Sequence, residues 1–144
     1  MNTGETAFPV YPREDESSGV LLPGDAVRVN RDSVRLIGGR CRSCSLETFP
    51  RYVVCPGCME EDVIESEMPP EGIVYSLSIV HVGPARWHKP LTLGYVDLTN
   101  GVRVFGHLKK GCQIGERVTI GLAEVGRDKG GGPINSFIFQ PAER

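Results

Sequence analysis

Two closely spaced pairs of cysteines are the residues of this chain best suited to chemistry. Cys41 and Cys44 form one C-x2-C pair, Cys55 and Cys58 form the other, and Ser45–Val54 separates them. A C-x2-C pair makes a tight turn with both sulfurs on the same side, so two adjacent pairs can present four thiolates at the corners of a tetrahedron. The spacing predicts a four-cysteine metal site of the zinc-ribbon type.

Disulfide bonds and iron are the alternatives to zinc at this site. Doubled C-x2-C spacing is specific for metal, and cysteines of one pair bridge poorly, so zinc is favoured over disulfides. Iron in a rubredoxin-like setting needs the same four sulfurs and stays open. With either metal, four protein ligands leave no position for water or substrate. The expected Zn²⁺ is therefore structural. The fifth cysteine, Cys112, is expected to be a small, partly buried residue.

Composition restricts the class of protein. The chain has 144 residues, enough for one domain or for two small modules with a shared core. Reduced cysteines, and an N-terminal segment without an apolar run, predict a cytoplasmic protein with no membrane segment. The net charge of −2 weighs against nucleic acid as the main partner, because binding to a polyphosphate backbone usually needs a basic surplus.

Three predicted parts position the cysteines. Residues 1–24 are rich in proline and charge, which predicts an extended arm. Residues 25–68 form the predicted ribbon, with short strands before the first cysteine pair. The segment between the pairs folds back as a hairpin whose side chains are expected to cover the metal: Phe49, Pro50, Tyr52 and Val53. The stiff segment Met68–Gly72 contains two prolines and marks the boundary to the third part, residues 69–144.

The third part reads as a small barrel. Five strand-like runs follow one another: Ile73–Val82, Leu91–Leu98, Val102–Leu108, Arg117–Val125 and Ser136–Gln140. Asn100 and Gly101 give a strong hairpin signal between the second and third runs. The glycine-rich segment Gly126–Pro133 is expected to be a flexible loop. The predicted fold is therefore mainly β, a rubredoxin-like ribbon followed by a five-stranded OB-fold barrel, with an open sandwich as the alternative.

This combination resembles a known family. A four-cysteine ribbon, a proline-containing linker, the strand entry Gly72–Ser76 and the hairpin Pro90–Gly106 resemble the zinc-ribbon/OB-fold proteins of acyl-CoA metabolism known as domain of unknown function 35. The resemblance covers about Val34 to Phe139. One departure is at the N-terminus, where the family often has a helix and this chain has several prolines.

The resemblance implies an accessory role. Family members occur with thiolase-superfamily enzymes, including acetoacetyl-CoA thiolase, hydroxymethylglutaryl-CoA synthase, sterol side-chain aldolases and benzoylsuccinyl-CoA thiolase. In such complexes the ribbon bridges subunits, the barrel lies near the partner's acyl-CoA tunnel, and the partner supplies the catalytic residues. The implied complex is a hetero-oligomer with acyltransferase activity.

A second candidate site lies in the loop between the first two barrel strands. Arg86 and Lys89 could bind the phosphates of coenzyme A, and Trp87, beside His88, could stack on adenine or enter a pocket of a partner. The plain alternative is a solvated loop with the tryptophan packed over the barrel mouth. The sequence predicts no catalytic residue of its own.

The leading hypothesis is thus a non-catalytic subunit that docks on a thiolase or a related synthase or aldolase. It helps to form the acyl-CoA site, and a coenzyme A ester is shared with the partner, for example in aromatic acyl-CoA degradation of the benzoylsuccinyl-CoA type. A single-stranded nucleic-acid-binding module and a free-standing acyl-CoA binder are the alternatives.

Overall fold

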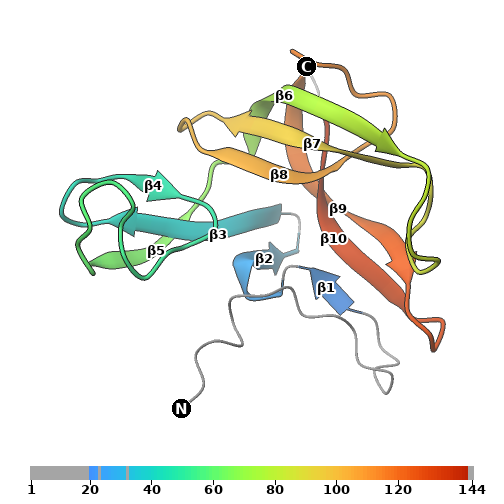
Figure 1. Cartoon of the computed structure of the whole chain (residues 1–144), viewed down its shortest axis with the longest axis horizontal. Helices are drawn as coiled ribbons and strands as arrows, with labels where there is room; N and C mark the ends of the chain where they lie inside the picture. The colour runs from blue at the N-terminus through green and yellow to red at the C-terminus, as the bar shows by residue number, and fades with distance from the viewer. Residues whose placement is uncertain (1–19, 23, 32, 143–144) are drawn as a thin grey trace.

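The computed structural model describes residues 20–22, 24–31 and 33–142 (Figure 1). Of the predicted arm, residues 1–19 and 23 lie outside the described residues, and so does the expected departure from an N-terminal helix. The described residues fold into β-strands joined by turns and contain no α-helix. The prediction of a mainly β protein is confirmed.

The strands follow the chain in two groups. The first group holds β1 (Val20–Leu22), a 3-10 turn η2 (Gly24–Ala26), β2 (Val27–Asn30), β3 (Ser33–Cys41), β4 (Glu47–Thr48) and β5 (Val63–Glu67). The second group holds β6 (Glu71–Val80), β7 (Leu91–Leu98), β8 (Arg103–Leu108), β9 (Arg117–Arg127) and β10 (Pro133–Pro141).

The ribbon is organised around β3. This strand pairs antiparallel with β2 through its first half and with β4 and β5 through its second half. Its alternating, β-branched start favours an extended strand, and Gly38 and Gly39 allow its neighbours to approach closely. A Cβ added at Gly39 would lie 2.7 Å from the Val63 side chain. The strand ends at Cys41, which delivers the first metal-binding thiol.

The second group closes into a barrel. Strands β8, β7, β6 and β9 are neighbours in one sheet, and β10 pairs with both β8 and β9, which joins the two edges. The pairing of β9 with β10 excludes an open sandwich, and the five-stranded OB-fold barrel is confirmed. The Asn100 hairpin joins antiparallel β7 and β8 as predicted, with Gly101 at a φ of 88°. The short strand β1 adds to β10 in parallel.

Two strand boundaries differ from the sequence prediction. The first barrel strand runs from Glu71 to Val80 and contains a bulge at Tyr75, so its alternation changes face part-way. The predicted flexible loop Gly126–Pro133 is shorter than expected, because β9 continues to Arg127 and β10 begins at Pro133, which leaves residues 128–132 as the turn between them. Gly126 lies within β9, where the absence of a side chain allows the backbone of Arg86 to approach closely.

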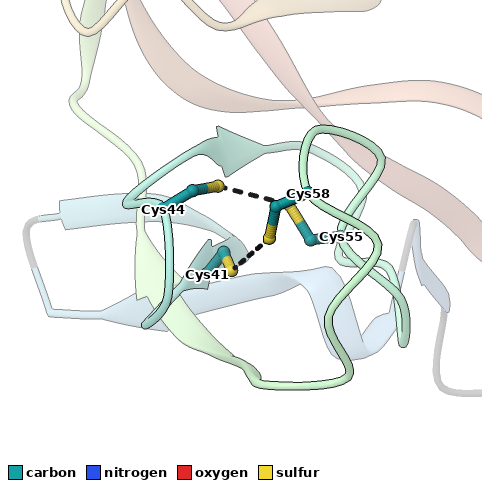
Figure 2. A group of neighbouring side chains, drawn as sticks. All are labelled: Cys41, Cys44, Cys55 and Cys58. Atoms are coloured by element: carbon teal, nitrogen blue, oxygen red, sulfur yellow. Dashed lines mark hydrogen bonds between the residues drawn. The ribbon is translucent and has the colours of Figure 1, made fainter.

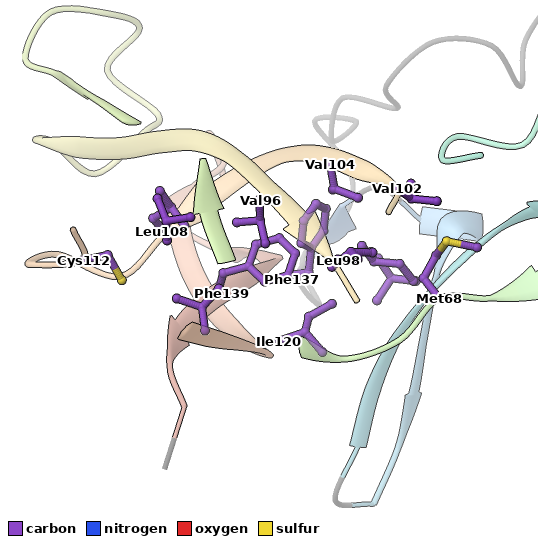
Figure 3. Close-up of a cluster of buried hydrophobic side chains, with 14 residues drawn as sticks. Met68, Val96, Leu98, Val102, Val104, Leu108, Cys112, Ile120, Phe137 and Phe139 are labelled. Atoms are coloured by element: carbon purple, nitrogen blue, oxygen red, sulfur yellow. The ribbon is translucent and has the colours of Figure 1, made fainter. Parts of the chain in front are cut away.

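Ribbon and barrel share one hydrophobic core. Figure 3 shows the barrel side chains converging with Met68, which comes from the linker and is 1% exposed. Val27 and Leu36 of the ribbon belong to the same cluster, and Phe49 packs against it. Cys112 is buried there too, as expected. Two small modules thus stabilise each other, since neither buries much apolar surface alone. The division between residues 25–68 and 69–144 stays a prediction.

Candidate metal centre

The four paired cysteines come together in the structure. Their Sγ atoms all lie within 4.8 Å of one another (Figure 2). The Sγ atoms of Cys41 and Cys58 are 3.6 Å apart, and those of Cys44 and Cys55 are also 3.6 Å apart. Each short distance therefore joins one cysteine of the first pair to one of the second, which holds the two turns together.

The two cysteine turns have the same backbone geometry. In the first, the amide of Ser45 donates to the carbonyl of Cys41 and the amide of Cys41 donates to Leu46. In the second, Met59 donates to Cys55, and Cys55 donates to the carbonyl of Glu60. Both turns place a non-glycine residue at positive φ directly after their second cysteine, with 69° at Ser45 and 67° at Met59. Such backbone conformations are retained where the surrounding site requires them.

The arrangement fits a tetrahedral metal ion. Sulfurs about 2.3 Å from a Zn²⁺ ion lie about 3.8 Å from one another, close to the distances here. A disulfide would need about 2.05 Å, and all four cysteines are free thiols. The amides of Cys58 and Gly57 hydrogen-bond Cys55 and lower the pKa of its thiol to about 7, whereas burial and the neighbouring thiols raise the pKa values of Cys44 and Cys58. Four thiolate donors suit zinc or iron.

The hairpin side chains expected to cover the metal lie elsewhere in the structure, and Pro50 is exposed. Tyr52 is 46% exposed and Val53 is 79% exposed, so these two side chains give the site little shielding. Phe49 points to the barrel instead, where its ring meets Phe137. The apolar residues of the ribbon hairpin thus divide between the shared core and the outer surface.

The candidate loop 84–90 lies at the opposite side of the molecule from β4 and β5 (Figure 1). It is bonded along its backbone to the β9–β10 hairpin. Trp87 forms a β-bridge with Gly126, the amide of Arg127 donates to Arg86 at 2.7 Å, and the amide of His88 donates to Val125 at 2.9 Å. A Cβ at Gly126 would collide with the carbonyl oxygen of Arg86.

The polar side chains of this loop already have partners within the chain. Nε2 of His88 lies 2.7 Å from the carboxylate of Glu124, which also faces Arg127 at 3.4 Å. The hydrogen bond with His88 and the nearby Arg127 guanidinium hold the pKa of Glu124 below its ordinary value. The ammonium of Lys89 donates to the carbonyls of Gly83, Pro84 and Trp87. The sequence gives no signal for Glu124, because its partner His88 lies in a loop far away along the chain.

Comparison with known proteins places these features in a context. A family model described as the ChsH2 C-terminal OB-fold domain matches residues 65–123. The chain is 31% identical over 110 residues to a protein named benzoylsuccinyl-CoA thiolase subunit BbsA from Thauera aromatica, covering 73% of this chain and 75% of that protein. It is 30% identical over 116 residues to a DUF35 domain-containing scaffold protein of Methanocaldococcus jannaschii, covering 75% of this chain and 82% of that one.

A solved structure agrees with the sequence matches. One chain of the structure called Ltp2-ChsH2(DUF35) aldolase superposes with a TM-score of 0.62 at 28% identity, covering 76% of this chain and 86% of that one. Within the described part of this chain, no helix is long and apolar enough to cross a membrane.

Proposed function

Since this chain belongs to the DUF35 family, with an OB-fold domain of the ChsH2 type, we propose that it is a non-catalytic accessory subunit of a thiolase-superfamily complex acting on acyl-CoA. The observation that carries the proposal is that its relatives are named as a thiolase subunit and as a scaffold protein, and that a structural relative bears the name of an aldolase. The partner chain would supply the catalytic residues.

The chemistry of the metal centre supports a structural role. Cys41, Cys44, Cys55 and Cys58 would hold Zn²⁺ with four thiolates and leave no position for substrate. Two of these ligands are buried in the ribbon, whose core merges with that of the barrel. The metal would therefore fix the ribbon as part of the docking body.

The loop of Arg86, Trp87, His88 and Lys89 is the proposed contact with coenzyme A or with the partner near its acyl-CoA site. In the free chain, Lys89 is engaged with backbone carbonyls and His88 with Glu124. Contact with a phosphate would therefore have to compete with these bonds. Half-exposed Trp87, the only tryptophan of the chain, is the side chain best placed to report such contact.

The likeness to the Thauera subunit supports an aromatic acyl-CoA, of the benzoylsuccinyl-CoA type, as the substrate of the complex. The chain is proposed to act in the cytoplasm, where acyl-CoA esters and reduced cysteines are found together.

Affinity purification of the tagged chain from its own cells, with mass spectrometry of the retained proteins, tests the function. A thiolase-superfamily protein in stoichiometric amount is expected, and the pair should cleave an acyl-CoA that the isolated chain leaves unchanged. Turnover by the isolated chain alone would refute the non-catalytic role. Retention of single-stranded nucleic acid, or of acyl-CoA without a protein, would point to the two alternative functions.

A further inference from the structure

Four large apolar side chains are exposed together on the outer surface of β6, β7 and β8. Ile73 is 42% exposed, Tyr75 53%, Tyr95 43% and Phe105 53%. Tyr95 and Phe105 are direct cross-strand partners, and their ring centroids lie 5.0 Å apart. We refer to these four residues as the aromatic face. A barrel surface of this kind is unusual, because exposed apolar residues of soluble proteins are mostly scattered.

The strand pattern builds this face. Val74, Val96 and Val104 point inward and are almost completely buried, so their neighbours along each strand point outward. The bulge in β6 falls at Tyr75, which opposes no single residue of β7. A bulge commonly redirects a side chain, and here it leaves Tyr75 beside the guanidinium of Arg103.

Ionic contacts hold the aromatic face in place. The Arg103 guanidinium carbon lies 3.4 Å from the centroid of the Tyr75 ring. Nε and Nη2 of Arg103 donate to the two carboxylate oxygens of Asp97 at 2.6 and 3.0 Å. Arg103 thus links all three strands. Rigid aromatic side chains lose little conformational entropy on binding, and Tyr and Arg are enriched among the residues that dominate interface energies.

The charges around the face cancel. Asp97 is neutralised by Arg103, and Glu71, at the start of β6, pairs with Arg117 at 3.1 Å. A single-stranded nucleic acid would require cations available for phosphates along the path of the bases. These two arginines are instead engaged with carboxylates. The charge balance therefore favours an apolar, uncharged protein surface as the occupant.

The two loops at the usual binding place of an OB fold are tied together in this chain. OB folds bind ligands on the face of their second and third strands and between the loops at the barrel mouth. Here those loops are residues 81–90 and 128–132, and the first is bonded through its backbone to the hairpin that bears the second. The sheet face remains open, and it is where the aromatic residues gather.

We infer that the aromatic face is the surface on which the catalytic subunit docks, with that subunit contributing an uncharged apolar patch. This inference rests on the proposed function. The match to the ChsH2-type OB-fold domain spans residues 65–123, which include all of β6, β7 and β8. The docking surface would thus lie in the part of the chain that matches this family model.

Co-purification with matched variants tests the inference. The full tagged chain, a Tyr95→Ser/Phe105→Ser variant and a Val82→Ser/Ile114→Ser control are each used to retain the thiolase-superfamily protein from the native cells. The control removes two apolar side chains that are more exposed, at 88% and 66%, but lie outside the face. Metal content and circular dichroism verify that all three chains are folded. The aromatic variant should retain at least about tenfold less partner, as expected when central anchors are removed.

The outcomes separate the two proposals. Equal retention by all three chains would refute the docking surface and leave the accessory function intact. If the unaltered chain retains no thiolase-superfamily protein, the accessory function fails and the inference fails with it. Nucleic acid retained by the unaltered chain and lost from the aromatic variant would overturn the inference in favour of a base-stacking platform. If the aromatic variant does not fold, p-benzoylphenylalanine incorporated at position 105 should cross-link to the same partner, and its failure to do so refutes the surface.

Discussion

The ring of Phe49 in the ribbon stands edge-on against the ring of Phe137 in the barrel, with their centroids 6.4 Å apart and their planes at 82°. Phe137 in turn meets Phe139 in a similar way at 5.8 Å. Gly106 leaves room for this stack, since a Cβ there would lie 2.5 Å from the Phe137 ring. The metal-binding module is thus attached to the barrel by an aromatic contact that reaches the centre of the core.

Replacing Phe49 with alanine should weaken both modules at once. The half-buried ring fills space between them, so Phe49→Ala should lower the free energy of unfolding by about 2 kcal/mol, less than for a fully buried phenylalanine. Urea unfolding followed by circular dichroism measures the loss. Val53→Ala, at a highly exposed position of the same hairpin, is the control and should change stability by less than about 0.5 kcal/mol. Equal effects of the two changes would contradict the shared core.

The purified chain should carry one metal ion bound by the four clustered thiols. Cys44→Ser should lose the metal and unfold the ribbon, because binding and folding of such small modules are coupled. Elemental analysis distinguishes zinc from iron, and an iron-loaded protein would also be coloured. Cys112→Ser changes the fifth cysteine, which lies outside the cluster, and should keep a full metal content. Loss of metal from both variants would argue against the assignment of the four ligands.

Gly126→Ala should separate the loop 84–90 from the β9–β10 hairpin. The new Cβ would collide with the backbone of Arg86, so the two segments must move apart. This should lower the free energy of unfolding by about 1–3 kcal/mol. Trp87 forms the bridge to Gly126, and its fluorescence should shift to longer wavelength as it becomes more exposed. Gly83→Ala in the same loop meets no atom within 4 Å and should leave the emission unchanged. An unshifted spectrum for Gly126→Ala would show that loop 84–90 and the β9–β10 hairpin are not bonded to each other in solution.

Acid should weaken the contact between His88 and Glu124. The pKa of Glu124 is lowered in the folded chain by its hydrogen bond with His88 and by the charge of Arg127. Its contribution to stability is therefore complete above its ordinary pKa of 4.5 and disappears as the pH falls through the lower folded value. Glu124→Gln should flatten this part of the dependence of Tm on pH.

Thermal melts of the unaltered chain and of Glu124→Gln, between about pH 3 and pH 6, measure this difference. The difference should shrink in high salt, because the pair is partly exposed. Parallel curves for the two proteins at low salt would refute the assigned role of Glu124.

Much of the architecture follows from local sequence signals. The doubled cysteine pairs predict the ribbon, and the Asn100 turn predicts the β7–β8 hairpin, since both depend on residues close together in the chain. The parallel pairing of β1 with β10 has no such signal, because the strand has three residues and its partner is far along the chain. The sequence places loop 84–90 between the correct strands, but it carries no signal for the contact with Gly126, which is distant along the chain.

No local pattern in the sequence predicts the aromatic face. Tyr75, Tyr95 and Phe105 come from three different strands, and only the register between those strands brings their side chains together. Scattered tyrosines and phenylalanines in the sequence therefore gave no indication of a continuous surface.

For protein engineering, the backbone bonds between loop 84–90 and the β9–β10 hairpin determine which part of this barrel can be randomised. Loop libraries at the mouth of an OB fold need two segments that vary independently. Here the two segments are bonded to each other through main-chain atoms, and Gly126 between them leaves no room for a side chain. New binding specificities would be better selected by varying the outward positions of β6, β7 and β8, whose inward neighbours already carry the core.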